Sequence, residues 1–189
     1  NIMVLRSQAR AEYNPRNIGH FGLSLQRYAH FTSPIRRYAD LLVHRSLIQC
    51  LKLGTDGLTK QEEAAMAELG VAISKTERRS QVAERDAKDR YCTAFLAEHV
   101  GASFSGRVSG VTRFGAFVEL DETGADGLIP GAMLSRERPR YDATRHQLTV
   151  GNARVRLGDQ VIVELVEAST VTGGLLLSLK EVNGKHWPH

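Results

Sequence analysis

The segment 30–40 contains the residues whose types and spacing most directly suggest chemistry. Pro34 suits the first position of a helix, because its missing amide N–H would have no partner there, and the threonine or serine before it is a good N-cap. A helix is therefore predicted from about Pro34, with Arg36 and Arg37 in its first turn. The helix dipole repels positive charge at that end, so an anion should offset the two guanidiniums. A phosphate would fit, since backbone amides, a hydroxyl and guanidiniums all bind its oxygens.

Asp40 offers a plainer explanation for the same two arginines. It lies at helical spacing from both, so the three side chains could form a solvated ion-pair face that needs no ligand. The other positions of this helix are mostly apolar, which predicts a helix buried nearly all round with one polar stripe. Such a stripe favours a cleft, but local chemistry alone supports the phosphate site and the ion-pair face about equally.

A second group with chemical potential lies in the segment 111–118, where two phenylalanines flank a Gly-Ala turn. Aromatic side chains on the face of a small β-barrel stack on nucleic-acid bases, at about 1–3 kcal/mol per base, while neighbouring cations hold the backbone. Phe114 lies next to the turn and to Arg113, which predicts that it is exposed. Phe117 could instead point into the core from its strand.

The elements that must position these groups fall into two parts. Up to about residue 100 the pattern is mostly helical, with one helix predicted over 34–53. A capping box at 59–62 begins a second helical stretch that continues to about residue 98, interrupted near Gly70. Residues 20–25 alternate like a short strand.

From Gly101 the sequence changes to short strands separated by turns. About five strands fit within 101–182, which suits a small closed barrel, and the OB fold is the commonest barrel of that size. The segment 135–157 is polar and rich in arginine, and it reads as a loop or hairpin inserted between strands. The predicted fold class is α+β: a helical part over 1–100, a five-stranded OB-type β-barrel over 101–182 and a tail over 183–189.

The composition is typical of a globular protein, with 42% of the 189 residues hydrophobic and 24% charged. The excess of basic over acidic residues, 25 against 21, gives weak support for a polyanionic partner. No apolar run is long enough to cross a bilayer, so no membrane partner is expected. Cys50 and Cys92 lack metal-ligand spacing and are predicted to be buried thiols, which favours a cytoplasmic location. The first residues read as the middle of an element, so we expect a piece of a longer protein.

The motifs at 19–23 and 28–45 resemble the C-terminal part of the catalytic RNB domain of the ribonuclease II and ribonuclease R family. Residues 101–182 resemble the S1-type RNA-binding OB domain that follows it, with landmarks at 115–118 and 126–129. The domain order and the inserted arginine-rich segment are closer to the ribonuclease R branch. The resemblance implies a parent protein that degrades single-stranded RNA processively from its 3′ end, releasing nucleoside monophosphates by Mg²⁺-assisted hydrolysis.

The resemblance also implies roles for residues of the helical part. Arg36 would be the catalytic arginine, which contacts the scissile phosphate and stabilises charge developing in the transition state. Arg37 would be a supporting phosphate contact. Glu84 matches a family glutamate that approaches the terminal ribose, where a contact to the 2′-hydroxyl helps to distinguish RNA from DNA.

In the barrel, two positions depart from the family pattern. A histidine often found after the third strand is Pro130 here, and a basic residue often found after the last hairpin is Leu175. The remaining predicted RNA contacts of the barrel are stacking by the two phenylalanines and two cations: Phe114, Phe117, Arg113 and Lys180.

The family's metal ligands are closely spaced aspartates upstream of the matched region, and this chain contains no such cluster. Without them no acidic cage can hold the Mg²⁺ ions that activate water. We therefore expect no metal ligand in this chain, a requirement for the missing N-terminal part of the catalytic domain, and no activity from these residues alone.

Two functions compete at this point. One is the C-terminal part of a Mg²⁺-dependent 3′→5′ exoribonuclease, and the other is a non-catalytic module that binds single-stranded RNA. A structural scaffold with an incidentally basic surface explains neither motif well.

Overall fold

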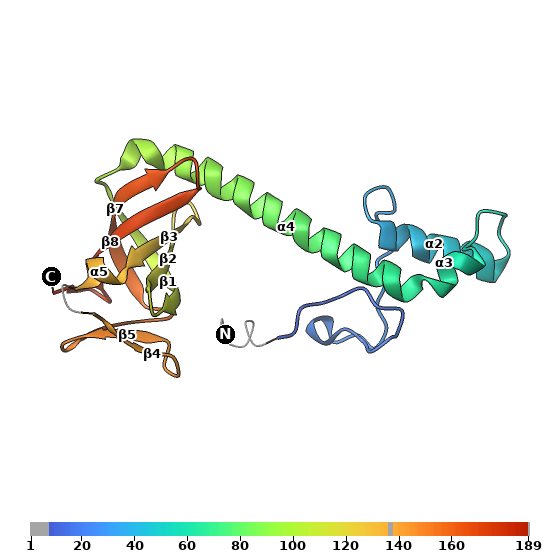
Figure 1. Ribbon diagram of the computed structural model, residues 1–189, viewed down its shortest axis with the longest axis horizontal. Helices are drawn as coiled ribbons and strands as arrows, with labels where there is room; N and C mark the ends of the chain where they lie inside the picture. The colour runs from blue at the N-terminus through green and yellow to red at the C-terminus, as the bar shows by residue number, and fades with distance from the viewer. Residues whose placement is uncertain (1–7, 136–137, 189) are drawn as a thin grey trace. The chain divides into compact units, whose positions relative to one another are not determined.

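The computed structural model describes residues 8–135 and 138–188, and the chain divides into two compact units, residues 1–82 and 83–189. Helix α4 (Met66–Leu96) contributes residues to both units (Figure 1). Residues 2–6, predicted to be the middle of an element, lie outside the described residues.

The first unit contains α2 (Tyr38–Leu51), the short α3 (Lys60–Ala64) and the first part of α4. The predicted capping box is present at the start of α3. The Thr59 hydroxyl accepts from the Glu62 N–H at 3.2 Å, and the Glu62 carboxylate accepts from the Thr59 N–H at 2.9 Å. This reciprocal pair satisfies two helix-end amides and fixes where α3 begins.

The break between the two later helices lies at Ala65, not near Gly70 as predicted. Gly70 is inside α4, where a Cβ atom would come within 2.5 Å of the Tyr13 carbonyl oxygen. The glycine therefore permits close packing of the chain's early segment against the helix, and it does not interrupt the helix.

The predicted start of α2 is wrong. The helix begins at Tyr38, so Arg36 and Arg37 precede it instead of occupying its first turn. Its N-cap is Arg37, whose backbone is extended (φ −125°, ψ 113°), and not the threonine or serine before Pro34. At the other end, Lys52 takes the left-handed conformation that closes the helix.

The surroundings of α2 also differ from the prediction of a helix buried nearly all round. Only Ala39, Asp40 and Leu42 are buried. Tyr38, Leu41, Leu47 and Leu51 are among the exposed large apolar side chains, because the described residues cover this helix on one side only.

Two smaller predictions for the helical part are corrected as well. Residues 20–25 form no strand, since Phe21–Leu23 is a 3₁₀ turn, η1, closed by a single bridge between His20 and Leu25. Cys50 is exposed and Cys92 is partly buried, and both are free thiols. Among the described residues, no helix combines the length and apolarity needed to cross a membrane.

The second unit is built on the predicted barrel, which follows the 3₁₀ helix η2 (Ala97–His99). Its five strands are β1 (Ser103–Thr112), β2 (Gly115–Leu120), β3 (Asp126–Pro130), β7 (Gln160–Ser169) and β8 (Gly174–Val182). They are ordered β3-β2-β1-β7-β8, and a parallel pairing of β3 with β8 closes the barrel. The α+β prediction with a five-stranded OB-type barrel is confirmed.

The barrel core follows from the alternation of side chains along each strand. Inward-facing apolar residues from all five strands are fully buried: Val108, Val118, Ile129, Val163 and Leu177. The outward-facing residues between them are half-buried or exposed, which makes the outer surface available for contacts.

The arginine-rich insert between β3 and β7 is more ordered than a loop or hairpin. After the short α5 (Gly131–Leu134) it forms β4 (Arg140–Asp142), β5 (Gln147–Val150) and β6 (Ala153–Arg156), paired antiparallel in the order β4-β5-β6. Leu148 and Val155 from this sheet belong to the same buried core as the barrel. The insert is therefore anchored to the barrel by one apolar face.

Within the predicted tail, residues 185–187 pack against the barrel. The two-residue strand β9 (Lys185–His186) pairs with β8. Trp187 is buried, and its indole Nε1–H donates to the Leu134 carbonyl at 2.8 Å. This hydrogen bond ties the end of the chain to α5.

Candidate functional site

The polar centre of the first unit is the turn at residues 33–37, immediately before α2. The Ser33 carbonyl accepts from the N–H groups of Arg36 at 3.3 Å and Arg37 at 3.0 Å. The wholly buried Asp40 reaches back, and its Oδ2 accepts from the Ser33 N–H at 2.8 Å and from the Arg37 guanidinium at 2.9 Å. One carboxylate thus holds both ends of the turn, which explains why the helix begins only after it.

The electrostatics of this turn favour a charged Asp40. Burial raises the pKa of its carboxyl, but hydrogen bonds from Arg37 and Ser33, together with the charge of Arg37, hold the pKa below its usual value. The hydrogen bond to Asp40 in turn raises the pKa of Arg37. Of the two explanations offered by the sequence, the ion pair with Asp40 is therefore the one observed for Arg37.

The ion pair between Arg37 and Asp40 has unused hydrogen-bonding capacity. Within the described residues, Arg37 Nε and Asp40 Oδ1 are buried and have no hydrogen-bond partner. Buried polar atoms are normally hydrogen-bonded. The pair could therefore take one further acceptor and one further donor.

Arg36 differs sharply from its neighbour. Its side chain is exposed, and across residues 8–135 and 138–188 it has no carboxylate within ion-pair distance. Ile35 beside it is wholly exposed. The two arginines of the turn therefore differ. The Arg37 guanidinium binds Asp40, which anchors the Ser33 backbone, whereas the Arg36 side chain is exposed and accessible to a ligand.

Next to this turn, two tyrosines and two histidines form a ring cluster for which no role is predicted from the sequence. The Tyr13 hydroxyl lies 2.7 Å from His30 Nδ1. Tyr28 makes edge-to-face contacts with His30 at 5.6 Å and with His20 at 5.2 Å between ring centroids. Burial, followed by Glu77, raises the pKa of Tyr13, which keeps its hydroxyl protonated. The close spacing of Tyr28 and His30 was the only signal in the sequence.

In the second unit, the turn between β1 and β2 presents the predicted stacking group. Phe114 is 67% exposed, and the Arg113 guanidinium lies 4.6 Å from the centre of its ring. Gly115 is required here, because a Cβ atom would run into the Ile129 carbonyl of β3. Phe117 is 39% exposed on the outer face of β2, so it does not belong to the core.

The outer face of the barrel around Phe117 is apolar in one row and charged in the next. Phe117 is paired with Leu128, and Leu128 with Leu176, which gives a half-buried apolar row across three strands. The neighbouring row consists of Arg107, Glu119 and Asp126. This surface suits stacking better than attraction of a phosphate backbone, because carboxylates outnumber cations in the charged row.

The other two predicted RNA contacts lie apart from this group. Lys180 is four residues along β8 from Leu176, roughly 13 Å at the usual rise of a strand, and it forms an ion pair with Glu164 at 2.6 Å. Glu84 is exposed on the part of α4 that belongs to the second unit. The structure thus gathers Arg113, Phe114 and Phe117 around one turn and leaves Lys180 and Glu84 outside it.

In the part of the chain that the structure describes, no three or more histidine, cysteine, aspartate or glutamate side chains are grouped so as to hold a metal ion. The described residues therefore do not fit a Mg²⁺ site.

Comparison with known proteins gives matches to both units. Residues 1–53 match the model of the RNB domain, and residues 98–180 match the model of the S1 RNA binding domain. Ribonuclease R of Aquifex aeolicus is 39% identical over 98% of this chain, and ribonuclease R of Escherichia coli is 42% identical over 86% of it. The chain spans about a quarter of the length of these relatives, 26% and 21% respectively.

Solved structures give a similar result. The apo form of RNase R from Mycoplasma genitalium superposes with a TM-score of 0.85 at 31% identity, covering 94% of this chain and 28% of that protein. The same protein in complex with ribose methylated single-stranded RNA gives the same values. In complex with double-stranded RNA it gives a TM-score of 0.70 at 29% identity.

Proposed function

Because the chain joins the last part of an RNB domain to an S1 RNA-binding domain, and so corresponds to the C-terminal part of ribonuclease R proteins, we propose that it supplies one part of a 3′→5′ exoribonuclease. The substrate is the 3′ end of single-stranded RNA, and the products are nucleoside monophosphates. In each step a water oxygen bonds to phosphorus while the bond from phosphorus to the 3′ oxygen of the preceding nucleotide breaks. The proposed location is the cytoplasm.

Arg36 is the catalytic residue in this proposal. The observation that carries the proposal is the exposed guanidinium at residue 36, which has no ion-pair partner among the described residues and belongs to the turn that Asp40 fixes, within a segment that matches the RNB domain. Two of its N–H groups would bind the oxygens of the scissile phosphate, on which negative charge grows as the phosphorus–oxygen bond breaks.

Arg37 and Glu84 have supporting roles. Among the described residues the buried Nε–H of Arg37 has no hydrogen-bond partner beside the ion pair with Asp40, and this group could donate to a phosphate or to the chain that surrounds it. The exposed carboxylate of Glu84 would accept a hydrogen bond from the 2′-hydroxyl of the terminal ribose, which DNA lacks.

The barrel grips the RNA strand upstream of its end. Bases would stack on Phe114 and Phe117, while Arg113 and Lys180 attract phosphates. Lys180 contributes the least of these, because Glu164 already neutralises it. Mg²⁺ bound elsewhere in the whole enzyme would supply the activation of water, and the described residues do not fit its site.

The test is mononucleotide release from a 3′-labelled single-stranded RNA, measured for the full-length parent protein and for residues 1–189 alone. We expect release by the parent and none by the 189 residues. The second candidate, an RNA-binding module, is favoured by the complete barrel with its exposed phenylalanines. An intact parent that binds RNA and releases no mononucleotide would establish that candidate and overturn the first.

A further inference from the structure

The insert 135–157 is a strongly basic segment of this chain. It contains six arginines and two carboxylates, for a net charge of +4, which equals the net charge of all 189 residues. The rest of the chain is therefore formally neutral in sum. Charge gathered in one short segment creates a much stronger local potential than the same charge spread over the surface.

The strand register places three of these arginines on one face of the small sheet. Arg140 is paired with Thr149, and Thr149 with Arg154, so the three form one cross-strand row. Because side chains alternate along a strand, the row of Asp142, Gln147 and Arg156 lies on the same face. Arg154 and Arg156 are thus about 6.7 Å apart along β6. With Arg145 from the β4–β5 turn they define what we call the arginine face: Arg140, Arg145, Arg154 and Arg156.

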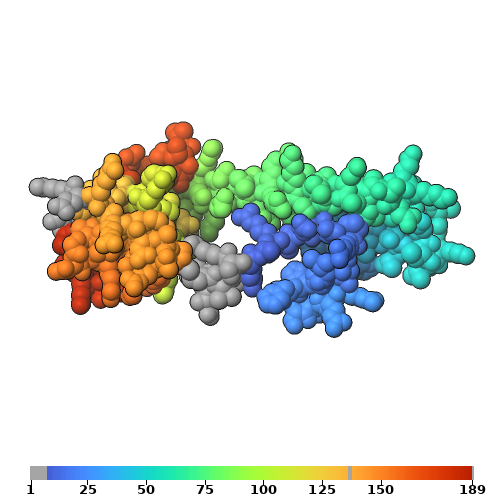
Figure 2. All heavy atoms as spheres, turned by 60° about the horizontal axis from the view of Figure 1, so that its bottom comes forward, coloured from blue at the N-terminus to red at the C-terminus, as the bar shows by residue number. Residues whose placement is uncertain are grey.

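The opposite face of the sheet fixes the direction in which the arginine face points. Leu148 and Val155 are buried in the barrel core at 1% and 0% exposure, so their side of the sheet is closed. All four arginines are exposed. The insert, drawn in orange, forms much of the near surface of the second unit in Figure 2.

The charge of the arginine face is scarcely neutralised within the protein. Asp142 is occupied by the turn, since its Oδ1 accepts from the backbone N–H groups of Thr144 and Arg145, both at 3.0 Å. Arg156 has one long ion pair, 3.7 Å from Asp159. Within residues 8–135 and 138–188, the other three arginines have no carboxylate at ion-pair distance. Their mutual repulsion would be relieved by a bound polyanion.

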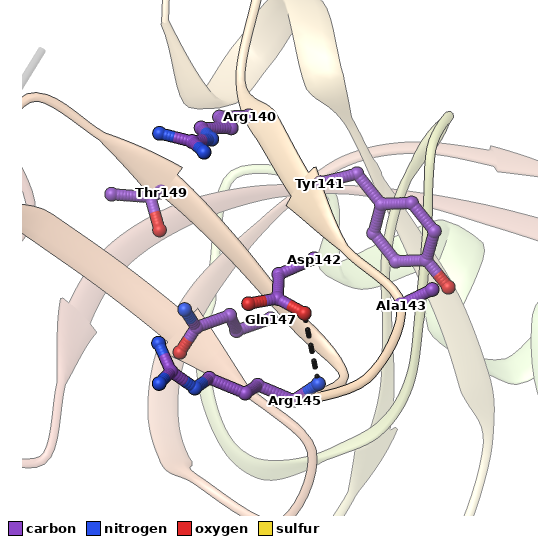
Figure 3. Close-up of a pocket in the computed structure, with 7 residues that line it drawn as sticks. All are labelled: Arg140, Tyr141, Asp142, Ala143, Arg145, Gln147 and Thr149. Carbon is purple, nitrogen blue, oxygen red and sulfur yellow. Dashed lines mark hydrogen bonds between the residues drawn. The ribbon is translucent and has the colours of Figure 1, made fainter.

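The surface beside these arginines is hollowed. Arg140, Arg145, Gln147 and Thr149 line a cavity of about 390 Å³, and Figure 3 shows these four side chains on one side of the hairpin with Tyr141 on the other. Arg154 and Arg156 line a second cavity of about 890 Å³ together with Lys185. The cations therefore follow a path across the sheet and onto the end of the chain.

The arginine face also begins close to the stacking turn. Pro139, directly before Arg140, has ring atoms 3.7 Å from the position that a Cβ on Gly131 would occupy. The Gly131 N–H donates to the Phe114 carbonyl at 2.8 Å. A nucleic-acid strand whose base stacks on Phe114 can therefore continue onto the insert, which belongs to the same unit.

We propose that the arginine face binds the phosphate backbone of single-stranded nucleic acid without regard to base sequence, as a second contact surface that continues from Phe114. The proposal rests on the RNA-binding function proposed above and adds a site that the stacking residues do not explain. Guanidinium groups bind phosphate oxygens with two parallel hydrogen bonds, and Thr149 and Gln147 supply uncharged donors between them.

The test compares a triple variant, Arg140→Gln, Arg145→Gln and Arg154→Gln, with the unchanged protein in fluorescence anisotropy titrations of labelled single-stranded RNA at several salt concentrations. We expect affinity at low salt to fall at least about tenfold and the slope of log affinity against log salt to become shallower by about 2, since each phosphate contact contributes about 0.7 for single strands. Single-stranded DNA of the same length should lose affinity by the same factor.

Three controls make the outcome decisive. A triple variant of Lys75→Gln, Arg78→Gln and Arg79→Gln removes the same charge from an exposed part of α4 and should change affinity by less than about threefold. The triple variant with lysine at residues 140, 145 and 154 should keep most of the affinity. Fluorescence of Trp187 during urea unfolding checks that the barrel remains folded.

The proposal is overturned if the 140, 145 and 154 glutamine variant binds like the unchanged protein, or if the α4 control loses as much affinity. If Phe114→Ala weakens binding in the same titrations while the glutamine variant does not, the proposed function stands and the arginine face fails. If the unchanged protein binds no RNA at all, both fail.

Discussion

In the barrel, five strands bury a continuous apolar core and leave Phe114 and Phe117 exposed. In the first unit, by contrast, the single buried carboxylate of Asp40 holds the turn that presents Arg36. The barrel's exposed groups are thus fixed by many apolar contacts, each replaceable by similar ones. The turn depends on two hydrogen bonds to one charged group. The comparison indicates that the barrel is insensitive to pH and sensitive to changes in core volume. The turn should be sensitive to pH and insensitive to the volume of apolar side chains.

The largest expected effect on stability comes from creating a cavity in the barrel core. Ile129→Ala removes a fully buried side chain and should lower the free energy of unfolding by about 2–5 kcal/mol. Urea unfolding followed by the fluorescence of Trp187, the only tryptophan, reports on the barrel specifically. The matched control is Leu41→Ala on the exposed side of α2, which should leave this transition within about 0.5 kcal/mol. An equal loss from both variants would remove the contrast between the units.

The next effect concerns stacking. Phe114→Ala should weaken binding of single-stranded RNA by about 1–3 kcal/mol, because a base loses its aromatic platform and Arg113 loses the ring that holds it. Anisotropy titration measures this. Val171→Ala, which removes another exposed apolar side chain, is the control. Unchanged affinity for Phe114→Ala would show that the turn does not contact RNA.

A smaller effect is expected from pH, which should loosen the turn of the first unit before it affects the barrel. The pKa of Asp40 is lowered in the folded protein from a reference value of 3.8, so its contribution to stability is complete well above pH 3.8 and is lost as the pH falls through the lower folded pKa. The protection of the Ser33 amide, measured as its exchange rate relative to the intrinsic rate at the same pH, should therefore fall below about pH 4, while Trp187 fluorescence stays constant. Asp40→Asn should show the lower protection at every pH. A barrel that loosens first would contradict the account.

The smallest effect is expected at Lys180. Its ion pair with Glu164 lies on the barrel surface, with both side chains more than a third exposed, 38% and 34%. Lys180→Gln should change RNA affinity by less than about twofold and stability by less than about 1 kcal/mol. A loss as large as that of Phe114→Ala would mean that RNA displaces Glu164 and that Lys180 is a principal contact.

The same contrast explains what the sequence could predict. Strand alternation and turn residues suffice for the barrel, because each strand's apolar face must point inward. The start of α2 was misplaced because Pro34 and the preceding serine satisfy the local rules for a helix start, while the carboxylate of Asp40 reaches back seven residues and binds Ser33 instead. The arginine face was missed because it depends on the pairing register of β4, β5 and β6, which composition does not reveal.

Some site residues can be predicted from local sequence and others cannot, because some depend on contacts with distant residues. Local chemistry left Arg36 and Arg37 equivalent, and only the geometry separates them, with Arg37 bonded to Asp40 and Arg36 exposed. Exposure of Phe114 followed directly from its place at a turn. The ring cluster joins Tyr13 to His30, 17 residues further along the chain, and the fold is needed to bring those two rings together.

The central claim is that Arg36 acts on the reacting phosphate while the barrel holds the strand. The most direct test is single-turnover hydrolysis and RNA affinity of the full-length parent carrying Arg36→Ala or Phe114→Ala. We predict that Arg36→Ala lowers the hydrolysis rate by about 10²–10³ with affinity changed less than about threefold. Phe114→Ala should lower affinity and leave the rate at saturating RNA nearly unchanged. Equal losses of rate and affinity for Arg36→Ala would contradict the account, because Arg36 would then only bind.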